Sequence, residues 1–130
     1  MRVYLVRHAE AAPGEPDALR ALTPGGRSAA RELGERLAAE GVQPTAVLSS
    51  PLLRARETAA ELARALGCDA EADERLAPGA TAETVRAAVA ERGDEVVVVG
   101  HQPDCGRIAV GISGGDEPAF PPAGLAVLDL

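Results

Sequence analysis

The chain has no lysine and no tryptophan, and its 130 residues include only one tyrosine, one phenylalanine, two histidines and two cysteines. A protein with so few aromatic rings is poorly equipped to bind nucleic acid by stacking on the bases. All 13 basic side chains are arginines, and the net charge of −7 does not attract polyanions through the overall field. A phosphate-binding site would therefore need arginines gathered at one place.

Long apolar runs and cysteine motifs are also missing. No segment approaches the roughly 18 apolar residues that a membrane span requires. The four apolar residues after Arg2 are too few for the core of a signal peptide. These absences predict a cytoplasmic protein that binds neither membrane nor nucleic acid. Cys68 and Cys105 have neither metal-ligand spacing nor a disulfide framework, so we expect both thiols to be reduced.

The pattern of apolar residues, glycines and prolines predicts alternating strands and helices. The expected strands cover residues 3–8, 46–49, 68–71, 95–101 and 125–130. The expected helices cover residues 24–40, 51–66, 82–92 and 103–112, the first three of them capped by Thr23, Ser50 and Thr81. We therefore expect residues 1–130 to form one domain, a three-layer α/β/α sandwich with a mostly parallel central sheet.

Both histidines stand at the ends of predicted strands. Arg7 directly precedes His8, and His101 follows the valine-rich strand. Ligands of open α/β sheets bind at the carboxyl ends of the strands. Arg54 falls in the first turn of the second helix, where unpaired N–H groups and the helix dipole favour phosphate. Together these four side chains would suit the transfer of a phosphoryl group.

Each of these residues also has a simpler explanation. A histidine after a strand is commonly a capping residue, Arg54 alone could be a solvated helix charge, and Arg7 alone could form a surface ion pair. The charged residues of the first two helices, Glu57 and Glu61 among them, are expected on solvated faces.

Two other kinds of site were weighed. Cys105 lies four residues after His101, which suggests a Cys–His nucleophile, but no orienting partner is evident. A metal site made of His8, His101 and a carboxylate has no supporting ligand spacing. We therefore expect no metal and no thiol chemistry.

Four short motifs follow one another along the chain: Arg7-His8-Ala9-Glu10-Ala11, Arg20-Ala21-Leu22-Thr23, the run from Ser49 to Thr58, and Gly100-His101-Gln102-Pro103. In this order and at these intervals they resemble the histidine phosphatase superfamily, and within it the small SixA-type phosphohistidine phosphatases. The resemblance covers almost the whole chain and implies a phosphoglycerate mutase-like fold. It also implies that His8 takes up the phosphoryl group, that Arg7, Arg54 and His101 hold its oxygens, and that no cofactor is needed.

The nucleophile of such an enzyme has to be neutral. One ring nitrogen of His8 should therefore donate to a backbone carbonyl while the other attacks, and cationic neighbours should lower the proton affinity of the ring.

The chain departs from the wider family at two positions. Larger members, including the phosphoglycerate mutases, carry a glutamate acid in the segment where Pro78 stands here, and Glu74 and Glu83 are the nearby alternatives. Gly14 stands near the place of the family's loop asparagine. Imidazole, with a pKa of about 6.5, leaves phosphorus with less help than an alkoxide. A missing acid therefore favours phosphohistidine over sugar phosphates.

The chain has no room for a lid, so the expected site is open and suits a phosphorylated protein. The loop over residues 9–22 is the only candidate cover. Arg20, at its end, is expected either to contact the anion or to lie near the Thr23 helix cap. Two rival functions stay open: a small-molecule phosphomonoesterase using the same residues, and a phosphate-binding module without catalysis.

Overall fold

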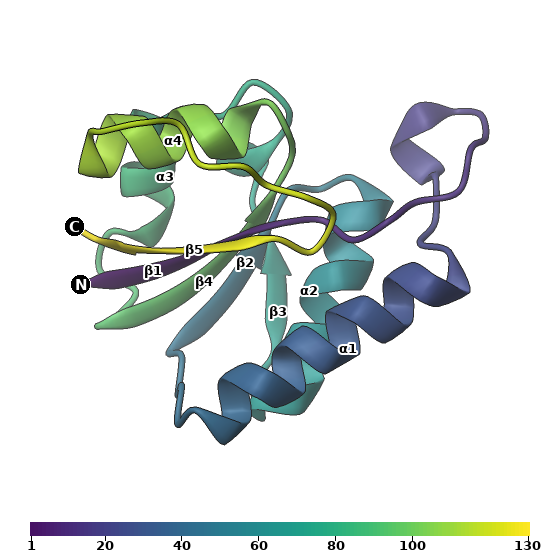
Figure 1. The fold of residues 1–130 in the computed structure, drawn as a ribbon, viewed down its shortest axis with the longest axis horizontal. Helices are drawn as coiled ribbons and strands as arrows, with labels where there is room; N and C mark the ends of the chain where they lie inside the picture. Colours follow the sequence, from purple (N-terminus) through teal and green to yellow (C-terminus); the bar gives the residue numbers. More distant parts are fainter.

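Five strands form one sheet in the order β3-β2-β4-β1-β5, in a computed structural model that describes residues 1–130 (Figure 1). The strands are β1 (Arg2–Arg7), β2 (Ala46–Ser49), β3 (Ala70–Ala72), β4 (Glu95–Gly100) and β5 (Leu125–Asp129). All neighbouring pairs are parallel except β1 and β5. None of the helices is both long enough and apolar enough to cross a membrane.

Helices cover both faces of this sheet. α1 (Pro24–Ala39) and α2 (Leu53–Leu66) lie on one face, and α3 (Ala82–Val89) and α4 (Asp104–Ser113) lie on the other (Figure 1). Alternate residues of the strands enter two separate apolar clusters, because successive side chains point to opposite faces. The valines of β4 are buried on both sides, as expected for a central parallel strand. The predicted three-layer α/β/α sandwich is confirmed.

The start of α2 differs from the prediction. Thr23 caps α1 as expected, with its hydroxyl accepting from the Gly26 N–H at 2.9 Å. Ser50 does not cap α2, which begins three residues later at Leu53 without a side-chain cap. The Ser50 amide continues the sheet by donating to the Val99 carbonyl, and its hydroxyl lies in the interior at the ends of the strands. Residues 51 and 52, between Ser50 and the start of α2, therefore stay outside the helix.

α3 ends at Val89, three residues earlier than predicted. The chain then turns through two residues with positive φ, Glu91 at 61° and Gly93 at 106°. A Cβ atom on Gly93 would lie 2.3 Å from the Thr45 hydroxyl, so this tight turn into β4 requires glycine.

Two glutamates that were expected on solvated helix faces lie instead in the contact between α1 and α2. Glu61 is only 6% exposed and pairs with Arg64 at 3.2 Å. Glu57 forms an ion pair with Arg27 and accepts from the Leu22 N–H at 2.8 Å. The prediction was wrong because the two helices pack against each other along these positions. Glu57 consequently fixes the end of the 9–22 loop to α2.

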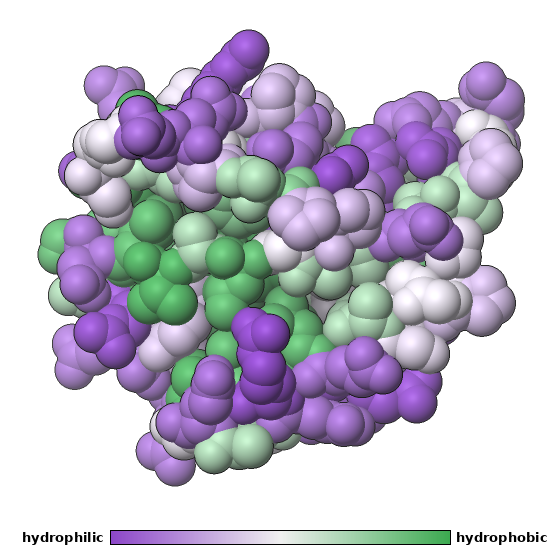
Figure 2. Space-filling view, viewed as in Figure 1, coloured by the Kyte–Doolittle hydropathy of each residue, from purple (hydrophilic) through white to green (hydrophobic).

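Exposed apolar side chains gather at the sheet edge formed by β5 (Figure 2). Val127 is half exposed, and Met1 and Leu130 beside it are also exposed. The two termini meet there, since the Leu130 N–H donates to the Met1 carbonyl at 2.9 Å. They lie at the opposite end of β1 from the strand ends that carry the histidines (Figure 1).

Candidate active site

The two histidines lie side by side because β1 and β4 are neighbours in register. Arg7 is paired with Gly100, and the His8 N–H donates to the Gly100 carbonyl at 2.9 Å. The ring centroids of His8 and His101 are 5.2 Å apart. Residues separated by more than ninety positions in the sequence thus meet at one point on the carboxyl edge of the sheet.

A cavity of about 320 Å³ opens at this edge. It is lined by Arg7, His8, Arg20, Arg54, Pro78, Gly79, His101, Gln102, Pro103 and Asp104. The structure therefore brings together all five residues predicted for the site, including Arg20. Glu74 and Glu83, the proposed replacements for a general acid, are not among the lining residues. The catalytic roles of the lining residues stay predictions.

His8 has one ring nitrogen occupied and one free. Its Nδ1 lies 2.7 Å from the Ala9 carbonyl oxygen. Because a carbonyl only accepts, Nδ1 carries the proton and Nε2 keeps its lone pair. This is the arrangement expected from the sequence. Burial lowers the pKa of His8, and the positive charges of Arg54, Arg7 and Arg20 lower it further, against the opposing effect of the Ala9 carbonyl. The ring is therefore neutral at neutral pH.

His101 is also held as a neutral ring. It is 5% exposed, and its Nε2 lies 2.7 Å from the Ser50 hydroxyl oxygen. Burial, followed by the neighbouring His8 and Arg54, lowers its pKa to about 4. The other ring nitrogen, Nδ1, is buried without a hydrogen-bond partner, and so is the Nε of Arg7. Since buried polar atoms are ordinarily paired, both atoms keep a hydrogen-bonding capacity that the protein itself does not use.

Arg54 reaches the cavity because Thr58 ties α2 to the end of β1. The fully buried Thr58 hydroxyl donates to the Arg54 carbonyl at 2.8 Å and accepts from the Ala9 N–H at 3.0 Å. The first turn of α2 is thereby fixed beside His8. The Arg54 side chain is only 10% exposed, so it is not the solvated helix charge that was considered as an alternative.

Two of the arginines, Arg54 and Arg20, are held by contacts with the loop over residues 9–22. Arg54 donates to both the carbonyl and the carboxylate of Asp17, at 3.0 and 3.2 Å. Arg20 donates to the same carboxylate at 3.1 Å and to the Ala12 carbonyl at 2.9 Å, rather than lying at the Thr23 cap. Hydrogen bonding from Arg20 is the main effect that lowers the pKa of Asp17. Arg7 donates to the Phe120 carbonyl at 2.9 Å and forms no surface ion pair.

Asp17, Ser50 and Asp104 take part in the site but were missed from the sequence. Asp17 lies in a segment without periodicity, where nothing indicated a partner for the arginines. Ser50 had been interpreted as a helix cap. Asp104 follows the Gly100-His101-Gln102-Pro103 motif directly, and this adjacency was the available signal.

The environment of Cys105 does not support a thiol nucleophile. The side chain is fully buried, with its Sγ 3.9 Å from the Val6 carbonyl oxygen. Burial, with a smaller effect of Asp104, raises its pKa to about 12. A protonated thiol enclosed in this way is not reactive. No group of three or more His, Cys, Asp or Glu side chains is arranged to hold a metal ion.

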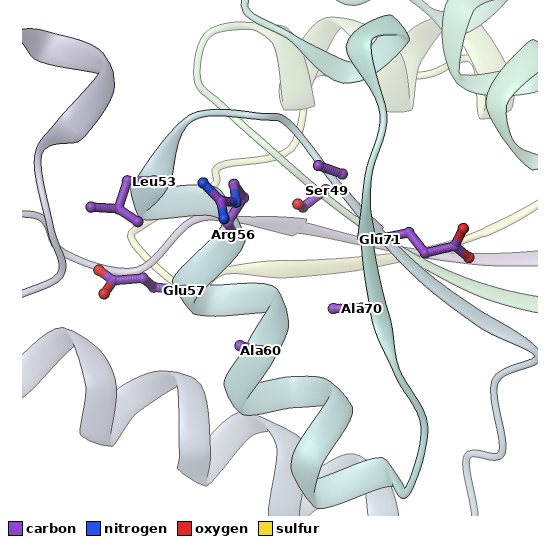
Figure 3. A pocket seen from close by; sticks show the side chains of 8 residues that line it. Ser49, Leu53, Arg56, Glu57, Ala60, Ala70 and Glu71 are labelled. Carbon is purple, nitrogen blue, oxygen red and sulfur yellow. The ribbon is translucent and has the colours of Figure 1, made fainter.

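A second cavity, of about 290 Å³, lies between α2 and β3 (Figure 3). Its lining includes Arg56, Glu57 and Ala60 from α2 and Ala70 from β3. It contains no histidine, and Glu71 of β3 points away from α2 in this view. The residues predicted to be catalytic all line the other cavity, which holds both histidines.

The lowered pKa of His101 predicts a loss of stability in acid. In the unfolded chain the His101 ring has a pKa near 6.5 and is protonated below that pH. In the folded protein its pKa is about 4, so the ring stays neutral down to about pH 4. Keeping the buried ring neutral therefore has almost no effect on the free energy of unfolding above pH 6.5, and it lowers that free energy progressively as the pH falls below 6.5. Between about pH 7 and about pH 5 the wild type should lose about 2 kcal/mol more than His101→Gln in urea unfolding. Equal losses in the two proteins would show that His101 is not buried in its neutral form.

Comparison with known proteins identifies the family of the chain. Residues 3–78 match the family model of the histidine phosphatase superfamily, branch 1. An uncharacterized protein of Picosynechococcus sp. is 37% identical over an alignment of 123 residues, which covers 88% of this chain and 74% of that protein. A probable phosphoglycerate mutase of Citrobacter koseri, GpmB, is 40% identical over 83 residues, but the match covers only 58% of this chain and 37% of the mutase.

Two solved structures are similar over nearly the whole chain. The protein histidine phosphatase SixA complexed with tungstate has a TM-score of 0.91 and 30% identity, covering 100% of this chain and 88% of that one. The putative phosphohistidine phosphatase SixA from Agrobacterium tumefaciens has a TM-score of 0.84 and 34% identity, covering 98% of this chain and 90% of that one.

Proposed function

Because the chain belongs to the histidine phosphatase superfamily, and within it to the SixA-type branch, we propose that it hydrolyses phosphohistidine on a protein substrate through a phosphorylated His8. The observation that carries the proposal is a neutral His8, with Nε2 free, in a cavity shared with three arginines and a second neutral histidine. We further propose that residues 1–130 act as one catalytic domain, in the cytoplasm.

The proposed reaction has two steps on phosphorus. In the first, the lone pair of His8 Nε2 attacks in line, the new P–N bond forms, and the bond to the substrate nitrogen breaks with its electron pair returning to that nitrogen. In the second, water attacks phosphorus and the electron pair returns to Nε2, while the proton of the water passes to the phosphate product. The proton stays on His8 Nδ1 throughout, donated to the Ala9 carbonyl in a hydrogen bond.

Charge stabilisation falls to Arg7, Arg54 and His101. The guanidinium groups present paired N–H donors to the phosphoryl oxygens, and the unpartnered Nδ1 of His101 is available to the same group. The proposal requires no metal ion, because guanidinium groups supply the positive charge around the phosphorus.

The dependence of kcat/KM on the leaving group tests the proposal. Pro78 lines the cavity where larger relatives would carry a glutamate acid, so a poor leaving group would depart without a proton. Phosphohistidine on a carrier protein and aryl phosphates of acidic phenols should be hydrolysed at least about 10²-fold faster than glycerol phosphate. The measurement is kcat/KM across this panel.

Similar rates on alkyl and aryl phosphates, with chemistry rate-limiting, would mean that a general acid is present. That result would favour the small-molecule phosphomonoesterase, an alternative to which the partial likeness to the probable mutase gives some support. Acid-labile phosphate trapped on His8 during turnover would argue for an enzyme over a phosphate-binding module.

A further inference from the structure

Asp104 is the single carboxylate among the residues that line the catalytic cavity. It stands at the first position of α4, three residues after His101. One of its oxygens, Oδ2, accepts from the Gly79 N–H at 2.8 Å, and Gly79 follows Pro78 in the cavity wall. The carboxylate is thus fixed between α4 and the 77–80 loop.

This negative charge is out of place in a site that only binds a phosphoryl group. The other charged residues that line the cavity are Arg7, Arg20 and Arg54, all cationic. A carboxylate close to phosphoryl oxygens would repel them and weaken binding of any phosphate monoester. In substrate binding, Asp104 would favour a substrate that carries a positive charge beside its phosphoryl group.

Protonated phosphohistidine is such a substrate. Its ring bears the phosphoryl group on one nitrogen and a proton on the other. The positive charge of the imidazolium therefore lies directly beside the negative charge of the phosphoryl group. Phosphate esters of sugars, phenols and glycerol have no cation at this place. The lining of the cavity, with three arginines and one carboxylate, offers partners for both charges of such a substrate.

We infer that Asp104 is a specificity-determining residue that accepts the N–H of the substrate imidazolium, an inference that rests on the phosphohistidine phosphatase function proposed above. Oδ2 is held by Gly79, and the second carboxylate oxygen, Oδ1, takes the substrate N–H.

The contact acts on the leaving group without transferring its proton. As the bond from His8 Nε2 to phosphorus forms, the bond from phosphorus to the substrate ring breaks and its electron pair returns to the ring. The proton on the distal nitrogen stays there, so neutral imidazole leaves. An unprotonated ring would have to leave as imidazolate, a far stronger base. By favouring the protonated ring, the Asp104 carboxylate ensures that the leaving group departs as a neutral molecule. A general acid has the same effect on an ester, where it supplies the proton itself.

The test compares two substrates in Asp104→Asn. The asparagine side-chain carbonyl can still accept from Gly79, but the negative charge is lost. We expect kcat/KM to fall about 10- to 100-fold on a phosphohistidine-containing carrier protein, the effect of removing a hydrogen bond between charged groups. On 4-nitrophenyl phosphate it should stay unchanged or rise. Asp104→Glu, which restores the charge, should recover part of the phosphohistidine activity and guards against a folding defect.

Glu83→Gln is the matched control, because Glu83 is also an acidic residue in the first turn of a helix but lies outside the cavity. It should leave both activities unchanged. If Asp104→Asn loses activity equally on both substrates, or on neither, the inference fails while the proposed function stands. If the wild type hydrolyses aryl phosphates but not phosphohistidine, the proposed function fails and the inference fails with it.

Discussion

Replacing His8 with alanine is expected to reduce kcat by roughly 10⁴-fold or more on every phosphorylated substrate, because the variant has no nitrogen to attack phosphorus. The arginines and His101 would remain, so inorganic phosphate should still bind. Steady-state turnover and trapping of the phosphoenzyme measure the two consequences together. The variant should give no acid-labile phosphate on the protein.

Cys105→Ser provides the control for this experiment. Its thiol lies close to the site but is protonated and enclosed, so the substitution should leave activity near the wild-type level. Substantial turnover by the His8 variant, or an inactive Cys105 variant with a normal fold, would transfer the nucleophile assignment to the thiol.

Arg54→Ala should lower kcat/KM by about 10²- to 10³-fold, by analogy with the loss of one oxyanion donor. The side chain is nearly buried beside His8, where a guanidinium is screened less than at the surface. Both the affinity for phosphate and the rate of the chemical step should fall. Inhibition by inorganic phosphate and single-turnover kinetics separate the two effects.

Arg56→Ala is the matched variant, since it removes the same charge from an exposed residue two positions along α2 that lines the other cavity. It should leave kcat/KM almost unchanged. Comparable losses in the two variants would mean that the net charge of the protein, and not the position of Arg54, governs phosphate binding.

The sequence predicted the layers of the fold and the candidate site because both depend on local signals. Buried valine runs predict strands, a Thr-Pro pair predicts a helix start, and Arg7, His8 and His101 stand directly at strand ends. That β4 pairs with β1, so that the two histidines meet, is a property of strand order. From the sequence, the meeting of the two histidines could be predicted only from the general rule for α/β sheets and from the family resemblance.

The errors arose where a side chain finds its partner far along the chain. Ser50 looks like a helix cap in its local sequence, yet its hydroxyl lies against His101. Glu57 and Glu61 have the spacing of a solvated helix face, yet α1 packs on that face, buries Glu61 and partly buries Glu57. Asp17 could be identified as a partner of Arg20 and Arg54 only from the folded position of the loop beside α2.

The Asp17 carboxylate, shared between Arg20 and Arg54, acts as a counter-ion that belongs to the protein itself. A phosphoryl group bound as proposed would compete with it for the same guanidinium groups, and a tethered competitor has an effective concentration on the order of millimolar. For an anion with a single negative charge and one pair of oxygens, the ion pair with Arg54 would be little stronger than the one that Asp17 already forms. A phosphoryl dianion, with three oxygens and twice the charge, offers more to both arginines at once. We therefore expect the site to bind phosphoryl dianions in preference to anions with a single charge.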